Sequence, residues 1–247
     1  MENPVALITG SAKRLGAATA RHLHQQGYDV VVHCHHSFDV ASRLCASLND
    51  QRQDSAKLLV ADLCDPKAWQ SLAEDAVMAF GRLDVLVNNA SAFYPTPVGD
   101  ITTDDWHILM GSNAQGPLFL SQYLQKHLAR NQGVIVNMVD IHAERPLASH
   151  TVYCMAKAAL VAMTRSLAIE LAPQVRVNGV APGAILWPEA PLSEQDKGDI
   201  LQQIPLGSLG TPDDIARTIA FLVASPYITG QIIAVDGGRS IASASKA

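Results

Sequence analysis

The sequence predicts an α/β protein in which one doubly wound, parallel sheet of about seven strands lies between two layers of helices. Short apolar strands alternate with longer helical segments along the whole chain. The strand candidates are rich in Val, Ile and Leu without strict alternation, which indicates strands buried on both faces of a parallel sheet. Strand–helix alternation with right-handed crossovers produces such a three-layer arrangement.

Seven segments have strand character and three long segments have helix character. The predicted strands are Val5–Ile8, Val30–His33, Leu58–Ala61, Val85–Val87, Val134–Met138, Val175–Val180 and Gln231–Val235. The predicted long helices are Arg14–Gln26, Asp104–Ala129 and Val152–Leu171. The stretch Ala181–Lys197 contains Pro182, Pro188 and Pro191 and cannot form one continuous helix. We expect the small, polar tail Ser240–Ala247 to fray unless it docks.

Length and composition favour one globular domain. The chain has 247 residues, with 18 Lys and Arg against 23 Asp and Glu, so its formal net charge is −5. An α/β domain often runs to about 250 residues, and we therefore expect residues 1–247 to form a single domain. A hydrophobic content of 48% with 17% charged residues excludes a disordered chain. The acidic balance argues against nucleic-acid binding, which needs clustered Lys and Arg.

Neither a membrane span nor a signal peptide is expected. The apolar runs are short, and the N-terminus lacks a basic region followed by a long apolar stretch. The four cysteines, Cys34, Cys45, Cys64 and Cys154, are far apart and form no Cys-x-x-Cys pair. This spacing indicates reduced thiols in a cytoplasmic protein rather than a disulfide framework or a zinc site.

A glycine-containing loop joins the first predicted strand to the first predicted helix. Residues 9–16 read Thr-Gly-Ser-Ala-Lys-Arg-Leu-Gly, in which Gly10 permits a tight turn and Gly16 lets the helix approach the sheet. Free N–H groups at the start of such a helix bind a pyrophosphate. The loop therefore predicts a dinucleotide site with the Arg14 guanidinium beside the phosphates. An ordinary strand–helix connection is the alternative.

The end of the second predicted strand bears on which nicotinamide cofactor binds. An NAD enzyme places an Asp or Glu there for the ribose 2′-hydroxyl, whereas this chain has His35, His36 and Ser37 and no carboxylate before Asp39. Imidazole and hydroxyl donors can instead bind a 2′-phosphate, so NADPH is favoured. A histidine-rich metal site is the weaker alternative, because adjacent strand residues point to opposite faces and no further ligand cluster follows.

Polar residues also follow the third and fourth predicted strands. Asp62 either caps the end of the third strand or accepts a hydrogen bond from the adenine amino group. Asn89, Ala90 and Ser91 follow the fourth strand, where the sheet opens toward a ligand, although Asn also suits a turn for local reasons.

Tyr153 and Lys157 are four residues apart on a predicted helix, so their phenol and ammonium groups can converge on one face. A Tyr with an unperturbed pKa of about 10 is a poor acid–base group at neutral pH. A nearby ammonium and a positively charged nicotinamide favour the phenolate and lower that pKa. Such a pair also occurs by chance on helices. Together with the nucleotide loop upstream, it indicates a catalytic pair.

Taken together, these motifs resemble those of the short-chain dehydrogenase/reductases. The motifs are Gly10…Gly16, Asp62, Asn88-Asn89-Ala90, Asn113, Tyr153-x-x-x-Lys157 and Pro182-Gly183, and the resemblance runs from about Val5 to about Gly238. It implies a Rossmann fold that binds its cofactor through Gly10, Arg14, Leu15, Gly16, His35, His36, Ser37, Asp62, Leu63, Asn89, Ala90, Ser91, Tyr153, Lys157, Pro182 and Gly183.

The same resemblance implies roles for the reacting groups. Tyr153 would be the proton donor, and Lys157 would bind the nicotinamide ribose while lowering the pKa of Tyr153. Asn113 would sit at a helix irregularity and hold a water for proton relay. Pro182 and Gly183 would lie beside the nicotinamide.

One position departs from the wider family. Its members usually have a Ser thirteen residues before the Tyr, whereas this chain has Asp140. An ionised Asp only accepts hydrogen bonds and cannot polarise a carbonyl oxygen, so a ketone reductase is disfavoured. A protonated Asp140 could polarise that oxygen, or Asp140 can instead help to deliver a proton through Tyr153 to a ring nitrogen. A structural hydrogen bond at the end of a strand is the alternative.

The same substitution is found in the pteridine reductases, which the chain resembles in residues 9–16, 89–97, 137–140 and 176–180. This resemblance implies that Phe93 stacks on a pterin, that Ser91 binds its polar edge, and that Arg14 bridges cofactor phosphate and substrate. A flat heteroaromatic ring gains from such stacking and a few polar groups. Phe93 as a core aromatic is the alternative, and Trp187 either lines the substrate mouth or only packs. His36 stands where members of the group commonly have Arg.

We therefore predict an NADPH-dependent pteridine reductase that acts on dihydrobiopterin-like pterins, dihydromonapterin or dihydrofolate. A carbonyl or 3-oxoacyl reductase and a catalytically idle NADP-binding sensor are the alternatives. The family resemblance implies a homotetramer whose subunits bury the apolar faces of the helices around Asp104–Ala129 and Val152–Leu171. Neither a metal nor a nucleic acid nor a membrane is expected as a partner.

Overall fold

Seven parallel strands form one sheet in the computed structural model, which describes residues 3–187 and 192–242. The strands are β1 (Val5–Ile8), β2 (Asp29–Cys34), β3 (Ala56–Val60), β4 (Val85–Asn88), β5 (Val134–Met138), β6 (Arg176–Pro182) and β7 (Ile232–Val235). Their order is β3-β2-β1-β4-β5-β6-β7, and every neighbouring pair is parallel. The predicted doubly wound sheet is confirmed.

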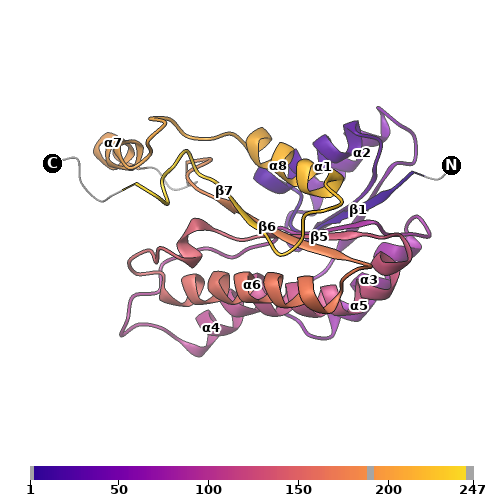
Figure 1. Cartoon of the computed structure of the whole chain (residues 1–247), viewed down its shortest axis with the longest axis horizontal. Coiled ribbons are helices and arrows are strands. Elements are labelled where there is room, and N and C mark those ends of the chain that lie inside the picture. The colour runs from indigo at the N-terminus through magenta and orange to yellow at the C-terminus, as the bar shows by residue number, and fades with distance from the viewer. Residues whose placement is uncertain (1–2, 188–191, 243–247) are drawn as a thin grey trace.

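Helices cover both faces of the sheet (Figure 1). One layer contains α1 (Arg14–Gln25), α2 (Phe38–Asn49) and α8 (Pro212–Ala224). The other contains α3 (Ala68–Met78), α4 (Thr103–Met110), α5 (Gly116–Arg130) and α6 (Thr151–Glu170). Every residue of α7 (Glu194–Gln202), which lies beyond one end of the sheet in Figure 1, is exposed or half-buried. Because all the strands are parallel, their carboxyl ends lie at one edge of the sheet, where ligands of such sheets bind.

Two apolar clusters fill the spaces between the sheet and its helix layers. Ile8 belongs to the cluster under α1, α2 and α8, and its neighbour Leu7 belongs to the cluster on the opposite face. The central strands are therefore buried on both faces, as predicted. The edge strands β3 and β7 differ, because each has a neighbouring strand on one side only, and most of their residues are partly exposed.

The helix α6 combines the length and apolar composition of a membrane-spanning helix, but half of that stretch is buried inside the molecule. Its residues pack against the sheet, and the buried Lys157 ammonium donates a hydrogen bond to the Met138 carbonyl of β5. These contacts are those of a core helix.

The predicted helix Asp104–Ala129 is not a single α-helix. A π-helical turn, η1 (Gly111–Gln115), separates α4 from α5. Gly116 is required where α5 begins, because a Cβ there would lie 2.9 Å from the Leu63 carbonyl oxygen. The irregularity that family resemblance implied at Asn113 is therefore present.

Two irregular segments are only partly as predicted. Within Ala181–Lys197, β6 continues to Pro182 and α7 begins at Glu194, while Pro188 and Pro191 lie outside the described residues. The start of the tail is docked rather than frayed, because the Arg145 guanidinium donates hydrogen bonds to the carbonyls of Arg239, Ser240 and Ala242.

Candidate functional site

The loop after β1 comes as close to its neighbours as its glycines predict. Gly10 has a φ of +61°, and a Cβ on it would lie 2.7 Å from the Ala90 Cα. A Cβ on Gly16 would lie 2.5 Å from the Asn89 amide nitrogen and 2.7 Å from the Gly10 carbonyl oxygen. The loop therefore tolerates no side chain at either position, and its backbone is free to contact a ligand.

The loop is fastened to the end of β4. The Asn89 side-chain amide donates hydrogen bonds to the carbonyls of Thr9 (2.8 Å) and Gly10 (3.0 Å). The Thr9 hydroxyl accepts hydrogen bonds from the backbone N–H groups of Asn89 (2.9 Å) and Ala90 (3.0 Å). Asn89 and Ala90 thus shape the predicted cofactor loop, and Thr9 is a contributor that the sequence analysis missed.

The N-terminus of α1 suits a phosphate. Lys13, its N-cap, makes no side-chain capping bond, and the first turn contains no acidic residue. By contrast, α8 begins with a capping box formed by Thr211 and Asp214. Unsatisfied N–H groups and the helix dipole favour an anion at such an end. The residues present therefore fit the pyrophosphate of a dinucleotide.

The Arg14 guanidinium contacts the backbone of Trp187. Arg14 has a φ of +52°, and its Nη2 donates to the Trp187 backbone carbonyl at 3.3 Å. Trp187 is half-buried, and residues 188–191, which follow it, lie outside the described chain. This contact joins the phosphate loop to the segment after β6. The proposed position of Trp187 at a substrate mouth stays a prediction.

Two exposed imidazoles follow β2. The ring centroids of His35 and His36 are 3.5 Å apart, and Nδ1 of His35 lies 3.7 Å from the Asp62 carboxylate. Ser37, the N-cap of α2, makes no side-chain capping bond. Asp62 also accepts a hydrogen bond from the backbone N–H of Cys64 at 2.8 Å, so the capping role predicted as an alternative is present.

The next residue, Leu63, is buried, and its carbonyl accepts the indole N–H of Trp69. All four cysteines are unpaired. Within residues 3–187 and 192–242, no group of three His, Cys, Asp or Glu side chains is arranged to hold a metal ion.

Tyr153, Asp140 and Lys157 meet at the carboxyl end of β5. The Tyr153 hydroxyl donates a hydrogen bond of 2.7 Å to Oδ2 of Asp140. The Lys157 Nζ lies 5.6 Å from the centre of the Tyr153 ring and donates to the Met138 carbonyl at 2.8 Å. Oδ1 of Asp140 accepts from the backbone N–H of His142, at the start of the short 3-10 helix η2 (Ile141–Ala143). The sequence analysis offered a structural hydrogen bond at the end of the strand and a contact with Tyr153 as alternatives for Asp140. Asp140 makes both, the first with the His142 N–H and the second with the Tyr153 hydroxyl.

The resemblance to the family implied a Tyr153 pKa lowered by Lys157, whereas in this structure the pKa of Tyr153 is raised. Burial and the adjacent Asp140 carboxylate raise the pKa of Tyr153 well above its usual value. Burial lowers the pKa of Lys157 to about 8. The physical reason is proximity: the phenol touches a carboxylate, while the ammonium hydrogen bonds to a backbone carbonyl. At neutral pH Tyr153 is therefore a phenol, the form a proton donor requires.

Asn113 is completely buried in the π-helical turn. Its amide nitrogen donates to the carbonyls of Ala92 and Leu109, each at 2.9 Å, and its oxygen accepts the Ser91 hydroxyl at 2.6 Å. These bonds fix Ser91 next to Tyr153, whose pKa the Ser91 hydroxyl lowers slightly against the larger effects. The relay water implied by family resemblance stays a prediction.

Phe93 is a surface aromatic and not a core residue. Its side chain is 53% exposed. The ring lies edge-on to Tyr153 and stacks on His150, with 4.8 Å between centroids in both cases. The sequence analysis missed His150, although its position three residues before Tyr153 places it beside that residue on one helix end. The exposed ring of Phe93 beside the phenol suits a flat ligand.

Pro182 and Gly183 lie at the carboxyl end of β6, at the same edge of the sheet. Pro182 is the last residue of β6, and Gly183 donates its backbone N–H to the Val235 carbonyl at 3.0 Å. A Cβ on Gly183 would lie 2.6 Å from the Asp236 Cβ, so only glycine fits.

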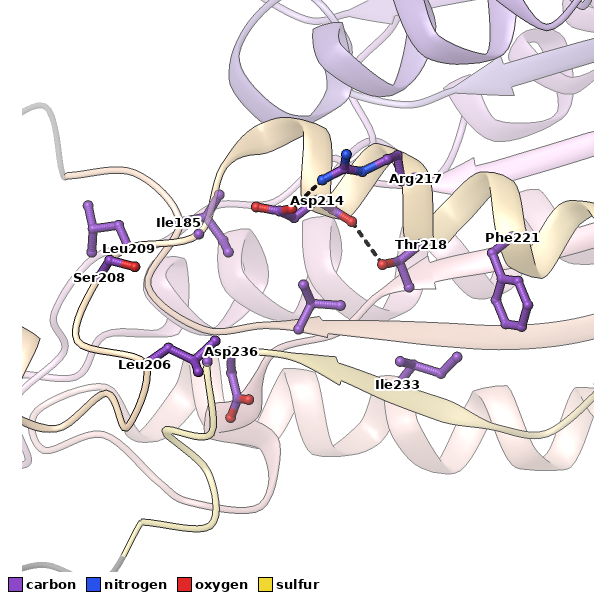
Figure 2. A pocket seen from close by; sticks show the side chains of 13 residues that line it. Ile185, Leu206, Ser208, Leu209, Asp214, Arg217, Thr218, Phe221, Ile233 and Asp236 are labelled. Atoms are coloured by element: carbon purple, nitrogen blue, oxygen red, sulfur yellow. Dashed lines mark hydrogen bonds and ion pairs between the residues drawn. The ribbon is translucent and has the colours of Figure 1, made fainter.

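Two cavities lie away from these side chains. The larger, of about 610 Å³, lies between α8, β7 and the loop before α8, and Figure 2 shows Leu206, Asp214, Arg217 and Phe221 around it. Asp214 and Arg217 pair with each other at 2.6 Å. The second, of about 450 Å³, lies between α4, η1, α5 and α6, where Trp106 and Leu118 line it. Tyr153 lines neither of these two cavities.

The fold and this site define a Rossmann-type, dinucleotide-binding oxidoreductase. The chain belongs to the short-chain dehydrogenase/reductase family: a family model described as enoyl-(acyl carrier protein) reductase matches residues 10–240. Members of this family typically use NAD(P)H.

Several curated proteins are similar over nearly their whole length. Pteridine reductase 1 of Leishmania tarentolae is 40% identical, with 96% of each chain covered. A putative ketoacyl reductase of the granaticin polyketide synthase of Streptomyces violaceoruber is 37% identical, with 97% of each covered. A 3-oxoacyl-(acyl-carrier-protein) reductase of Thermotoga maritima is 32% identical, with 98% of this chain and 99% of that protein covered. The family is thus established, and the substrate is a separate question.

Proposed function

We propose that the protein is an NADPH-dependent pteridine reductase, which reduces dihydropterins of the dihydrobiopterin or dihydromonapterin type, and dihydrofolate, to their tetrahydro forms. The contact between Asp140 and the Tyr153 hydroxyl carries this proposal. A carboxylate that accepts a hydrogen bond from the phenol cannot polarise a ketone oxygen. It is compatible with a substrate that takes a proton on a ring nitrogen.

The residues divide the work as follows. NADPH, when bound, supplies a hydride to the carbon of a C=N bond. Phe93 offers an exposed ring on which the substrate stacks, and Tyr153 gives its phenolic proton to the adjacent nitrogen. The resulting phenolate is stabilised by the ammonium of Lys157 and regains its proton from solvent.

The 2′-phosphate of NADPH is assigned to the residues after β2. His35 and His36 are exposed there, and the hydroxyl of Ser37 is not used as a helix cap. The nearby carboxylate, Asp62, pairs with His35 and caps the Asp62–Cys64 turn. A 2′-phosphate therefore meets imidazole donors rather than an unpaired acid.

Similarity to pteridine reductase 1 supports this proposal, while similarity to two ketoacyl reductases supports the competing reaction. The deciding assay follows NADPH oxidation by the purified protein with dihydrobiopterin, dihydrofolate and an acetoacetyl thioester in parallel. Turnover confined to the pterins and folate supports the proposal. Turnover confined to the thioester identifies a 3-oxoacyl reductase, and tight NADPH binding without any turnover identifies a sensor.

Two variants test the assigned roles. Tyr153→Phe removes the proton donor and should lower turnover by roughly 10²-fold or more, with NADPH binding much less affected. Asp140→Ser restores the residue of the wider family. A gain of thioester reduction in Asp140→Ser, with loss of pterin reduction, is the result expected if Asp140 selects the substrate.

We also propose a homotetramer. Exposed apolar side chains gather on the helices of one face, among them Trp106 on α4, Leu118 on α5 and Met155 on α6. A second apolar surface, with Leu206 and Phe221, surrounds the cavity beside β7 (Figure 2). Two separate apolar surfaces suit closed symmetric assembly, which light scattering tests. The unpaired cysteines support a cytoplasmic location, and neither a nucleic acid nor a membrane is proposed as a partner.

A further inference from the structure

A buried histidine joins two of the loops to which the dinucleotide is assigned. His33, in β2, is 2% exposed, and β2 lies between β1 and β3 in the sheet. Its Nδ1 accepts the backbone N–H of Gly10 at 3.1 Å, and its Nε2 lies 3.2 Å from the Ala61 carbonyl oxygen. One imidazole thus spans the loop after β1 and the loop after β3.

The two partners define the protonation state of this ring. The Gly10 N–H can only donate, so Nδ1 must carry no proton, and the Ala61 carbonyl can only accept, so Nε2 must carry one. Burial lowers the pKa of His33 to about 4, which agrees with a neutral ring at physiological pH. A second proton on Nδ1 would face the Gly10 N–H and break that bond.

The backbone of His33 holds the same loop. Its carbonyl accepts the N–H of Ser11 at 2.9 Å, and its own N–H donates to the Ser11 hydroxyl at 3.1 Å. Three hydrogen bonds thus fix Gly10 and Ser11 to β2, and only the imidazole also reaches Ala61, the residue before Asp62. Gly10 has a φ of +61°, and because glycine has access to many other backbone conformations, a fixed partner for its N–H holds the loop in this one.

We propose that His33 is a positioning residue of the dinucleotide site: its neutral imidazole holds the Gly10 loop and the Asp62 loop at a fixed separation, so that the pyrophosphate and adenosine ends of the cofactor are bound together. This inference rests on the proposal that the protein binds NADPH at these loops. It needs neither a pterin substrate nor Asp140.

The test compares His33 variants by the Kd for NADPH, measured by fluorescence titration. His33→Phe keeps the ring shape and loses both bonds, and we expect the Kd to rise about five- to tenfold, as for a buried N–H left unsatisfied. His33→Asn places an oxygen near the position of Nδ1 and should recover most of the affinity. His33→Gln, which reaches toward Ala61 instead, should recover less.

A matched control separates this role from loss of any buried histidine. His24 is also 2% exposed, and its Nε2 bonds to the Ser55 hydroxyl just before β3, at the opposite edge of the sheet. His24→Phe should leave the Kd for NADPH unchanged even where it lowers the melting temperature. Adenosine 2′-phosphate, which reaches only the adenosine end, should lose less affinity than NADPH in His33→Phe.

The possible results of this test lead to three distinct conclusions. An unchanged Kd in His33→Phe, an equal rise in His24→Phe, or no recovery in His33→Asn overturns the inference. Absence of NADPH binding by the unaltered protein overturns both the inference and the proposed function. NADPH binding that depends on His33, in a protein that reduces no pterin, overturns the proposed function alone.

Discussion

Replacing Gly16 with alanine tests how closely α1 approaches the cofactor loop. The added Cβ would lie 2.5 Å from the Asn89 amide nitrogen, 2.7 Å from the Gly10 carbonyl oxygen and 2.7 Å from the Ser11 Cα. Two of these three atoms belong to the backbone, so relief requires α1 or the loop to move. The amide of Asn89 must also move, and with it two hydrogen bonds, to Thr9 and Gly10.

The expected destabilisation follows from these contacts. Overpacking of a closed site costs about 1–3 kcal/mol, and each lost hydrogen bond costs about 0.5–1.5 kcal/mol. Alanine returns up to about 1 kcal/mol through its higher helix propensity. Gly16→Ala should therefore lower the free energy of unfolding by about 3 kcal/mol, which is a melting temperature lower by roughly 6–12 °C for a chain of this size.

Gly198→Ala is the matched control, because Gly198 lies inside α7 and a Cβ there would meet nothing within 4 Å. That variant should be more stable by up to about 1 kcal/mol. Thermal unfolding and NADPH titration of both variants are the assays, and only Gly16→Ala should weaken NADPH binding. If Gly16→Ala has the same melting temperature as Gly198→Ala and binds NADPH normally, α1 does not approach the cofactor loop as closely at Gly16 as the structure indicates.

Three further predictions concern other parts of the site and the fold. Turnover should fall as pH rises through about 8, because burial lowers the pKa of Lys157 to about 8 and the ammonium form exists below that value. Phe93→Leu should raise the KM for dihydropterin by about fivefold through loss of ring stacking, while the stability changes by less than about 0.5 kcal/mol because the ring is exposed. Arg176→Met should lower the free energy of unfolding by about 2–3 kcal/mol, since its guanidinium donates two hydrogen bonds of 2.7 Å to carbonyls at the end of α8.

Each of these has a control. In Lys157→Arg, whose side chain stays protonated, the decline above about pH 8 should disappear from whatever activity is left; a decline that persists assigns it to another group. Equal KM values for Phe93→Leu and the unaltered protein would remove Phe93 from the substrate site. Arg217→Met, which breaks an ion pair of a 60% exposed side chain, should change stability by less than about 1 kcal/mol, and a cost equal to that of Arg176→Met would contradict the role given to buried carbonyl contacts.

Local patterns in the chain were enough to predict most of the strands and helices. Runs such as Val134–Met138, free of Gly and Pro, predict a strand from the residues alone, and the strand has these bounds in the structure. The glycines of the first loop were predicted for the same reason, because a tight turn and a close backbone approach leave few other residues to choose from. The residues around Asn113 have no local pattern that predicts a π-helical turn, and the predicted helix Asp104–Ala129 is divided there in the structure.

The sequence by itself determined the alternation of strands and helices, the dinucleotide loop and the pairing of Tyr153 with Lys157 on one helix, since all three depend on neighbours within a few residues. Tertiary structure alone decided that the Tyr153 hydroxyl bonds to Asp140, that Phe93 is exposed and stacks on His150, and that His33 spans two loops. Those contacts join side chains on different elements. Their distances, and the direction of the Tyr153 pKa shift, depend on how strands pack side by side and how much water that packing excludes, which no local pattern records.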